Sequence, residues 1–99
     1  MTYNLFIAYD LAEPGQNYEA VIARITSLGP WYKLQYSLFY VHSGHNIQVT
    51  HDHVRSVMDG NDKLAVIDAK DAYVSLVPAA DLQVLRSEWA KGQPTGTNP

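Results

Sequence analysis

The stretch Leu5-Phe6-Ile7-Ala8-Tyr9-Asp10 decides how the rest of the chain is interpreted. A nearly continuous apolar run of this kind is typical of a strand that is covered on at least one face. Asp10 closes the run, and a carboxylate that ends a buried strand lies at the rim of a sheet, where ligands and metals are usually bound. The turn Pro14-Gly15 and a helical pattern follow. The chain is therefore predicted to begin with a strand, an acidic residue, a loop and a helix.

Length and composition predict one globular domain. The chain has 99 residues, 46% of them hydrophobic, and a net charge of −3. We expect a single domain at 1–91 and a flexible tail at 92–99, which is rich in Gly, Pro and Thr. Because the chain has no cysteine, disulfides, zinc–thiolate sites and thiol catalysis are excluded. No basic signal-peptide region and no apolar run near the roughly 20 residues of a membrane helix is present, so we expect a cytoplasmic protein without membrane association.

Helical spacing of apolar residues predicts three helices. The first covers 17–28, with Asn17 as its N-cap and Gly29-Pro30 as its stop signal. The second begins at about Asn46 and ends before the turn at 60–62. The last begins at Pro78, which suits the first position of a helix.

Aromatic and β-branched residues predict the strands. After a first strand at 3–9, the segment 31–41 predicts two short antiparallel strands with a reversal near 33–36; further strands are predicted at 63–69 and, short, at 73–77. The order β-α-β-β-α-β predicts an α+β domain in which two helices cover one face of a four-stranded antiparallel sheet, with a short fifth strand and a C-terminal helix. The residues expected in the core are Phe6 or Ile7, Ile22, Ile25, Leu38, Val54, Val66 and Ile67.

Three segments together resemble a known family. They are 5–11 (LFIAYDL), 35–39 (QYSLF) and 61–67 (NDKLAVI), and their order and spacing agree. They are similar to the first-strand, third-strand and fourth-strand segments of the CRISPR-associated Cas-two proteins and their VapD-like toxin relatives. The resemblance covers 3–77. It implies a ferredoxin-like βαββαβ fold and a symmetric homodimer.

The resemblance also implies a site. In that family the first-strand aspartate of each subunit faces the dimer axis, where a divalent metal has been proposed to bind, and Asp10 is the matching position. Some members are metal-dependent nucleases, and others are structural subunits that hold DNA with a partner integrase. Asp10 is accordingly the expected catalytic residue and Mg²⁺ ligand of an endonuclease acting on RNA or DNA. Tyr9, through stacking on a base, and Ser37, which matches a position near the axis, are the expected substrate-binding residues.

The residues themselves leave two roles open for Asp10. Two symmetry-related carboxylates can share one Mg²⁺, which prefers hard oxygen ligands and keeps several waters. Such an ion polarises a phosphate or activates water. The other role is local: Asp10 accepts hydrogen bonds from backbone N–H groups near Ala12 or Glu13 and so caps the loop. The aromatic residues are likewise expected either to stack on bases or to pack in the core.

The charge of the chain favours a second function. Nucleic-acid binders are usually basic, and this chain is mildly acidic and lacks the arginines and lysines that often follow strands one and three in the family. The alternative is a non-catalytic dimeric adaptor of a CRISPR, toxin–antitoxin or phage-related system. Such a module binds a protein partner through its sheet edges and its terminal helix.

Four histidines lie close together in the sequence: His42, His45, His51 and His53. Histidine is a common transition-metal ligand. However, His51 and His53 are two residues apart, so they point in different directions on a helix. Only His42 and His45 can converge, and Asp52 is poorly placed as a third ligand. The histidines therefore form either a metal site or a polar, partly exposed start of a helix, and we assign His42 and His45 no catalytic role.

Overall fold

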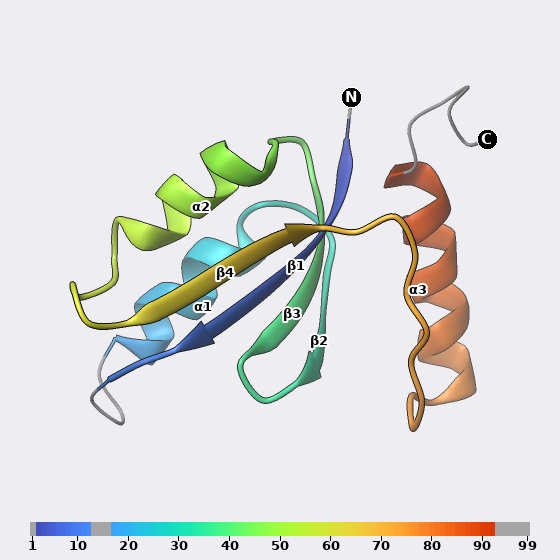
Figure 1. The fold of residues 1–99 in the computed structure, drawn as a ribbon. Coiled ribbons are helices and arrows are strands. Elements are labelled where there is room, and N and C mark those ends of the chain that lie inside the picture. The colour runs from blue at the N-terminus through green and yellow to red at the C-terminus, as the bar shows by residue number, and fades with distance from the viewer. Residues whose placement is uncertain (1, 13–16, 93–99) are drawn as a thin grey trace.

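A computed structural model describes residues 2–12 and 17–92. Apart from the fifth strand predicted at 73–77, its elements follow the predicted order, with an α+β architecture of four strands and three helices (Figure 1). The elements are β1 (Tyr3–Asp10), α1 (Tyr18–Thr26), β2 (Trp31–Gln35), β3 (Leu38–Ser43), α2 (Ile47–Arg55), β4 (Lys63–Asp68) and α3 (Ala79–Gly92). The predicted tail after position 92 and the turn Pro14-Gly15 lie outside the described residues.

The four strands form one antiparallel sheet in the order β2-β3-β1-β4. β1 is an inner strand: Ile7 pairs with Phe39 of β3 on one side and with Val66 of β4 on the other. β2 and β3 form a hairpin that reverses at Tyr36 and Ser37, slightly later than predicted. The four-stranded antiparallel sheet expected from the sequence is confirmed.

Side chains of β1 alternate between two differently covered faces. Leu5, Ile7 and Tyr9 are buried on the face covered by α1 and α2. Phe6 points to the opposite face, where its ring lies 5.7 Å from that of Trp89 on α3. Figure 1 shows α3 on the other side of the sheet from α1 and α2. The core on the α1/α2 face consists of Ile7, Tyr9, Leu11, Val21, Ile25, Phe39, Val41 and Val54.

The prediction of a fifth strand at 73–77 is wrong. This segment has no strand or helix, Tyr73 and Leu76 are fully exposed, and Leu76 has a φ of 60°. A β-prone sequence becomes a strand only where a sheet edge offers hydrogen bonds. Here the chain leaves β4 and crosses to α3, so the segment pairs with no strand among the residues that the structure describes (Figure 1).

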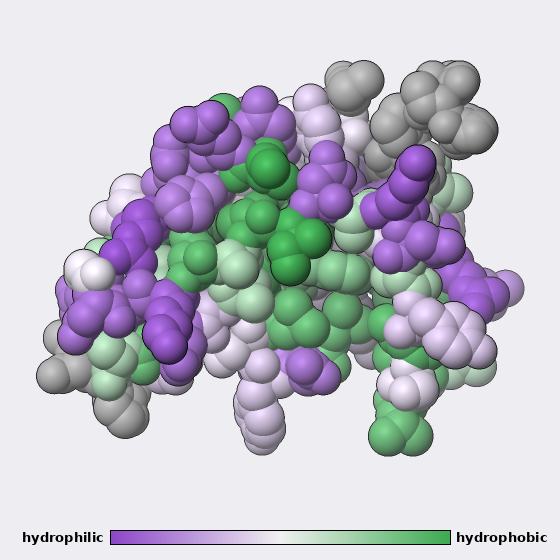
Figure 2. All heavy atoms as spheres, viewed as in Figure 1, coloured by the Kyte–Doolittle hydropathy of each residue, from purple (hydrophilic) through white to green (hydrophobic). Residues whose placement is uncertain are grey.

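The predicted core is confirmed in its centre and wrong at one edge. Ile7, Ile25 and Val54 are buried, whereas Ile67 is 51% exposed. β4 is an edge strand, and Ile67 lies on the face away from α1 and α2. Figure 2, in the view of Figure 1, shows hydrophobic surface in the middle of the molecule and hydrophilic residues over α2. The other predicted core residues, Ile22, Leu38 and Val66, are partly buried.

Two helix ends follow their sequence signals with differences in detail. Asn17 occupies the N-cap of α1, but it has a left-handed φ of 62° and its side chain makes no capping bond. Asn46 does cap α2, because its side chain accepts the N–H of Val49. Gly29 has a φ of 150°, and a Cβ there would collide with the backbone of His42, so glycine is required at this stop. No helix in the described part of the chain is long and apolar enough to cross a membrane.

Candidate functional site

Asp10 lies at the exposed end of β1, at the rim of the sheet. Its neighbour across the β1–β4 ladder is Lys63. Within 2–12 and 17–92, no hydrogen bond or ion pair engages the Asp10 carboxylate. Asp10 thus lies at a sheet rim, as the sequence predicted, and no residue in the described part of the chain occupies its oxygens.

Asp62, not Asp10, caps the loop after β1. Its Oδ1 accepts the backbone N–H of Ala12 at 2.7 Å, and its Oδ2 accepts that of Asp59 at 2.8 Å. Arg55 donates to the carbonyl oxygens of Asp62 and Asp59 and closes the same turn. These two N–H donors, aided by the charge of Arg55, lower the pKa of Asp62. The capping role of Asp10 at Ala12 is thus wrong; Glu13 lies outside the described residues.

Tyr9 and Ser37 meet beside the end of β1. The backbone N–H of Tyr9 donates to the carbonyl of Ser37 at 3.1 Å, and Ser37 occupies the hairpin turn with a left-handed φ of 61°. The Tyr9 ring is buried between the rings of Tyr18 and Phe39, at centroid distances of 6.2 and 6.3 Å. Desolvation is the main cause that raises the pKa of Tyr9, and Tyr18 adds to it, while a hydrogen bond with Ser37 opposes it. A ring enclosed in this way offers no open face to a base.

An apolar strip borders Asp10 on its own face of the sheet. Strand alternation places Asp10 on the same side as Phe6 and Ala8, away from α1 and α2. Ala8 pairs with Leu38 of β3 and with Ala65 of β4. We call these three residues, Ala8, Leu38 and Ala65, the open strip: none of them is buried, and Ala65 is exposed. α3 contacts β1 nearer the start of this strand, on Asn4 and Phe6.

The histidines do not gather into one site. His42 faces α3, where its Nδ1 lies 2.8 Å from Glu88 Oε1. His51 is near the surface and contacts its neighbour Asp52. His53 lies between α1 and α2, and burial, together with Arg24 and His45, lowers its pKa. In the described part of the chain no three His, Asp or Glu side chains are grouped so as to hold a metal ion.

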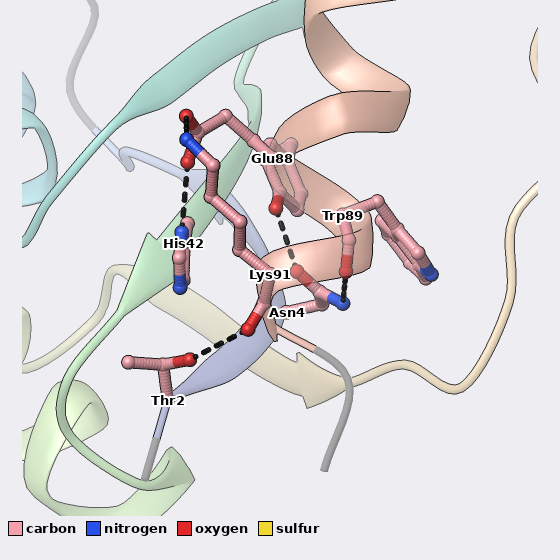
Figure 3. A network of polar contacts seen from close by, with 7 residues as sticks. Thr2, Asn4, His42, Glu88, Trp89 and Lys91 are labelled. Atoms are coloured by element: carbon pink, nitrogen blue, oxygen red, sulfur yellow. Dashed lines mark hydrogen bonds and ion pairs between the residues drawn. The ribbon is translucent and has the colours of Figure 1, made fainter. Parts of the chain in front are cut away.

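The sequence did not reveal a polar network between α3 and the sheet (Figure 3). Tyr40 donates to Asn4 Oδ1 at 2.6 Å, and Asn4 donates to the carbonyl of Trp89 at 2.8 Å. Burial, with a smaller effect of the Glu88 charge, strongly raises the pKa of Tyr40. Asn4 and His42 are ladder partners within otherwise apolar strands. Polar residues inside apolar strands need specific hydrogen-bond partners when they are buried. Asn4 and His42 were therefore the residues from which the sequence could have indicated this network.

In the same network, Glu88 near the end of α3 contacts His42 of β3 and Lys91 of its own helix. Glu88 accepts from His42 through Oε1 and from Lys91 through Oε2 at 3.0 Å. The hydrogen bond with His42, followed by that with Lys91, lowers the pKa of Glu88. The Nε2 atom of His42 is buried and has no hydrogen-bond partner among the residues that the structure describes. The network therefore serves to dock α3 (Figure 3). Its β1 residue is Asn4, near the start of the strand, whereas Asp10 is the last residue of the strand.

In comparisons with family models, curated proteins and solved structures, nothing matches this chain.

Proposed function

We propose that this chain is a Cas-two-like homodimer with a ferredoxin-like fold that cleaves RNA or DNA with the help of Mg²⁺ held by Asp10. The observation that carries this function is the exposed Asp10 carboxylate, which has no partner in the described part of the chain and ends an inner strand at the sheet rim. A nucleic-acid enzyme of this kind acts in the cytoplasm.

The topology supports the fold assignment. The sheet order β2-β3-β1-β4 is antiparallel throughout, and α1 and α2 both connect strands that are not neighbours. The two helices share one face of the sheet (Figure 1). These features support the proposal of the split βαβ arrangement that the resemblance implies.

The open strip supports a two-fold contact near Asp10. An apolar row that is not buried in one chain gains stability when a second copy covers it. In a two-fold interface the same patch meets itself, so residues beside the axis approach their own copies. Because the open strip is next to Asp10 on the same face, such a contact brings two Asp10 side chains near each other.

The residues present fit a magnesium ion. Asp10 offers hard carboxylate oxygens, and one or two carboxylates with several waters are what this ion accepts. When bound, Mg²⁺ neutralises phosphate charge and activates water for attack on phosphorus. Asp10 holds the cation, and Lys63, across the ladder from Asp10, supplies positive charge for a phosphate.

A specific observation favours a second function, that of a non-catalytic dimeric adaptor. The segment between β4 and α3 exposes Tyr73 and Leu76 completely, and the net charge of −3 disfavours nucleic acid. In the adaptor, this segment pairs with the sheet edge of a second subunit or with a protein partner.

A cleavage assay separates the two functions. Wild type and Asp10→Asn are incubated with single- and double-stranded RNA and DNA in Mg²⁺ or Mn²⁺, with EDTA as the metal-free control. The amide keeps the shape of the side chain and removes the charge, so cleavage is expected only in the wild type. Asp68→Asn, an exposed carboxylate at the other end of β4, is the matched control and should cleave normally. Wild-type activity no higher than that of Asp10→Asn would leave the adaptor as the better account.

A further inference from the structure

A cavity of about 730 Å³ lies between α3, the sheet and the segment that precedes α3. Phe6 and Leu34 of the sheet line one side, and Leu82, Leu85 and Trp89 of α3 line another. This volume falls within the range of roughly 300–1,000 Å³ that is typical of small-molecule sites. The cavity is separate from Asp10, which lies beyond the open strip on β1.

Hydrogen bonds near both ends of α3 join this helix to the sheet. Near its start, Asp81 accepts a hydrogen bond from Tyr32 on β2 at 2.9 Å, and near its end the Trp89 carbonyl accepts one from Asn4. Leu82 and Leu85 lie between these two anchors and face the cavity. A register shift between Lys33 and Gln35 in β2 accompanies the placement of Leu34 in the cavity wall. The two hydrogen bonds fix α3 on the sheet near both of its ends, and the cavity lies along the helix between them.

The charges at this cavity define the ligand. Arg86 lines it and, in the residues that the structure describes, makes no hydrogen bond or ion pair. Asp71 also lines it, but one of its oxygens already accepts the N–H of Ala72 at 2.8 Å. Arg86 is thus an available cation beside an apolar space, while Asp71 disfavours a head group with more than one negative charge.

We infer that this cavity binds a small amphipathic monocarboxylate. Its apolar body lies against Leu34, Leu82 and Leu85, beside the ring pair of Phe6 and Trp89. Its carboxylate pairs with Arg86, whose planar guanidinium matches a carboxylate with two parallel hydrogen bonds. The apolar wall supplies affinity, and Arg86 supplies the preference for an anion.

Trp89 fluorescence tests this site in the full chain. The chain has two tryptophans, so Trp31→Phe leaves Trp89 as the only reporter. Decanoate is titrated below its micellar concentration, with decanol as the neutral analogue. We expect a saturable change with both ligands and tighter binding of decanoate. Arg86→Gln should weaken decanoate about fivefold, as expected for an exposed ion pair, and leave decanol unchanged.

Two further variants sharpen the outcome. Asp71→Asn removes the opposing charge and should strengthen decanoate binding. Lys33→Gln removes an exposed cation that lies over Tyr36 and should change nothing. No saturable response of Trp89 to decanoate, or an equal loss of decanoate and decanol in Arg86→Gln, overturns the site. A response of Trp89 to protein concentration that decanoate does not alter also overturns it, because a second copy then occupies the cavity.

Discussion

The carboxylate of Asp62 accepts the backbone N–H of Ala12 at 2.7 Å, from a position fifty residues further along the chain. The bond joins the loop after β1 to the turn before β4. This bond affects the candidate site directly. The N–H of Ala12 already donates to Asp62, so it is not the group that Asp10 accepts from. Within 2–12 and 17–92, the carboxylate of Asp10, two residues before Ala12, has no hydrogen-bond partner.

The stability of the protein should depend on Asp62 in a pH-dependent way. Two backbone N–H groups lower its folded-state pKa below the ordinary value of 3.8. A lowered carboxyl pKa stabilises the fold above the unfolded value, and that contribution is lost as pH falls through the folded one. In urea unfolding, Asp62→Asn should therefore be less stable than wild type at neutral pH, and the difference should shrink below about pH 3.8. A difference that stays constant down to the acid limit would contradict the assignment; Asp68→Asn serves as the control.

Ile25→Ala should lower the free energy of unfolding by about 2–5 kcal/mol, because a fully buried isoleucine leaves a cavity when it is truncated. Ile67→Ala is the matched control, since Ile67 is half exposed, and it should change stability by no more than about 0.5 kcal/mol. Chemical denaturation of both variants measures the two values. Equal losses of unfolding free energy in the two variants would contradict the burial of Ile25 in the core and the exposure of Ile67.

Tyr40→Phe should destabilise the docking of α3. The substitution removes the donor of a buried 2.6 Å hydrogen bond and leaves Asn4 Oδ1 without it, at a cost of about 1–3 kcal/mol. Tyr36→Phe removes a hydroxyl from a side chain that is 91% exposed and should be neutral. Hydrogen exchange of the α3 amides, together with unfolding curves, reports the loss. Unchanged exchange in Tyr40→Phe would show that the network does not hold α3.

The extent to which sequence predicted this fold follows from which interactions are local. The apolar run of β1 and the apolar stripes of α1 and α2 are local patterns, and they placed these elements correctly. The hairpin was also predicted from local sequence, although it reverses slightly later than expected. The strand predicted at 73–77 failed because a strand needs a partner edge, which the segment itself does not encode. The prediction that Ile67 is in the core was wrong because β4 lies at the edge of the sheet, which local sequence does not show.

The site was predictable only in part for the same reason. A carboxylate at the end of an apolar run placed Asp10 at the rim. The pairing of Ala12 with Asp62, and of Asn4 with Tyr40 and Trp89, joins segments far apart in sequence. Such pairings are set by tertiary packing, and no local spacing reveals them.

The proposed dimer can be tested by its mass and by a substitution in the open strip. Light scattering at micromolar concentration should give twice the chain mass of 11.1 kDa. Leu38→Lys places a charge in the open strip and should yield the monomer, because a buried unpaired charge is costly. Ile67→Lys, on the same face but outside the strip, is the control and should remain dimeric. A wild type that runs as a monomer would remove the paired-aspartate site with the dimer.

Binding of Mn²⁺ to the purified protein tests the role of Asp10 most directly. Calorimetric titration of the wild type should show one ion for every two chains, because two Asp10 carboxylates share it across the two-fold axis. Asp10→Asn should lose this binding while it keeps the same mass and unfolding curve, and Asp68→Asn should bind as the wild type does. Mn²⁺ binding of equal strength and stoichiometry in the wild type and Asp10→Asn, or none in either, would contradict the assignment of Asp10 as the metal ligand.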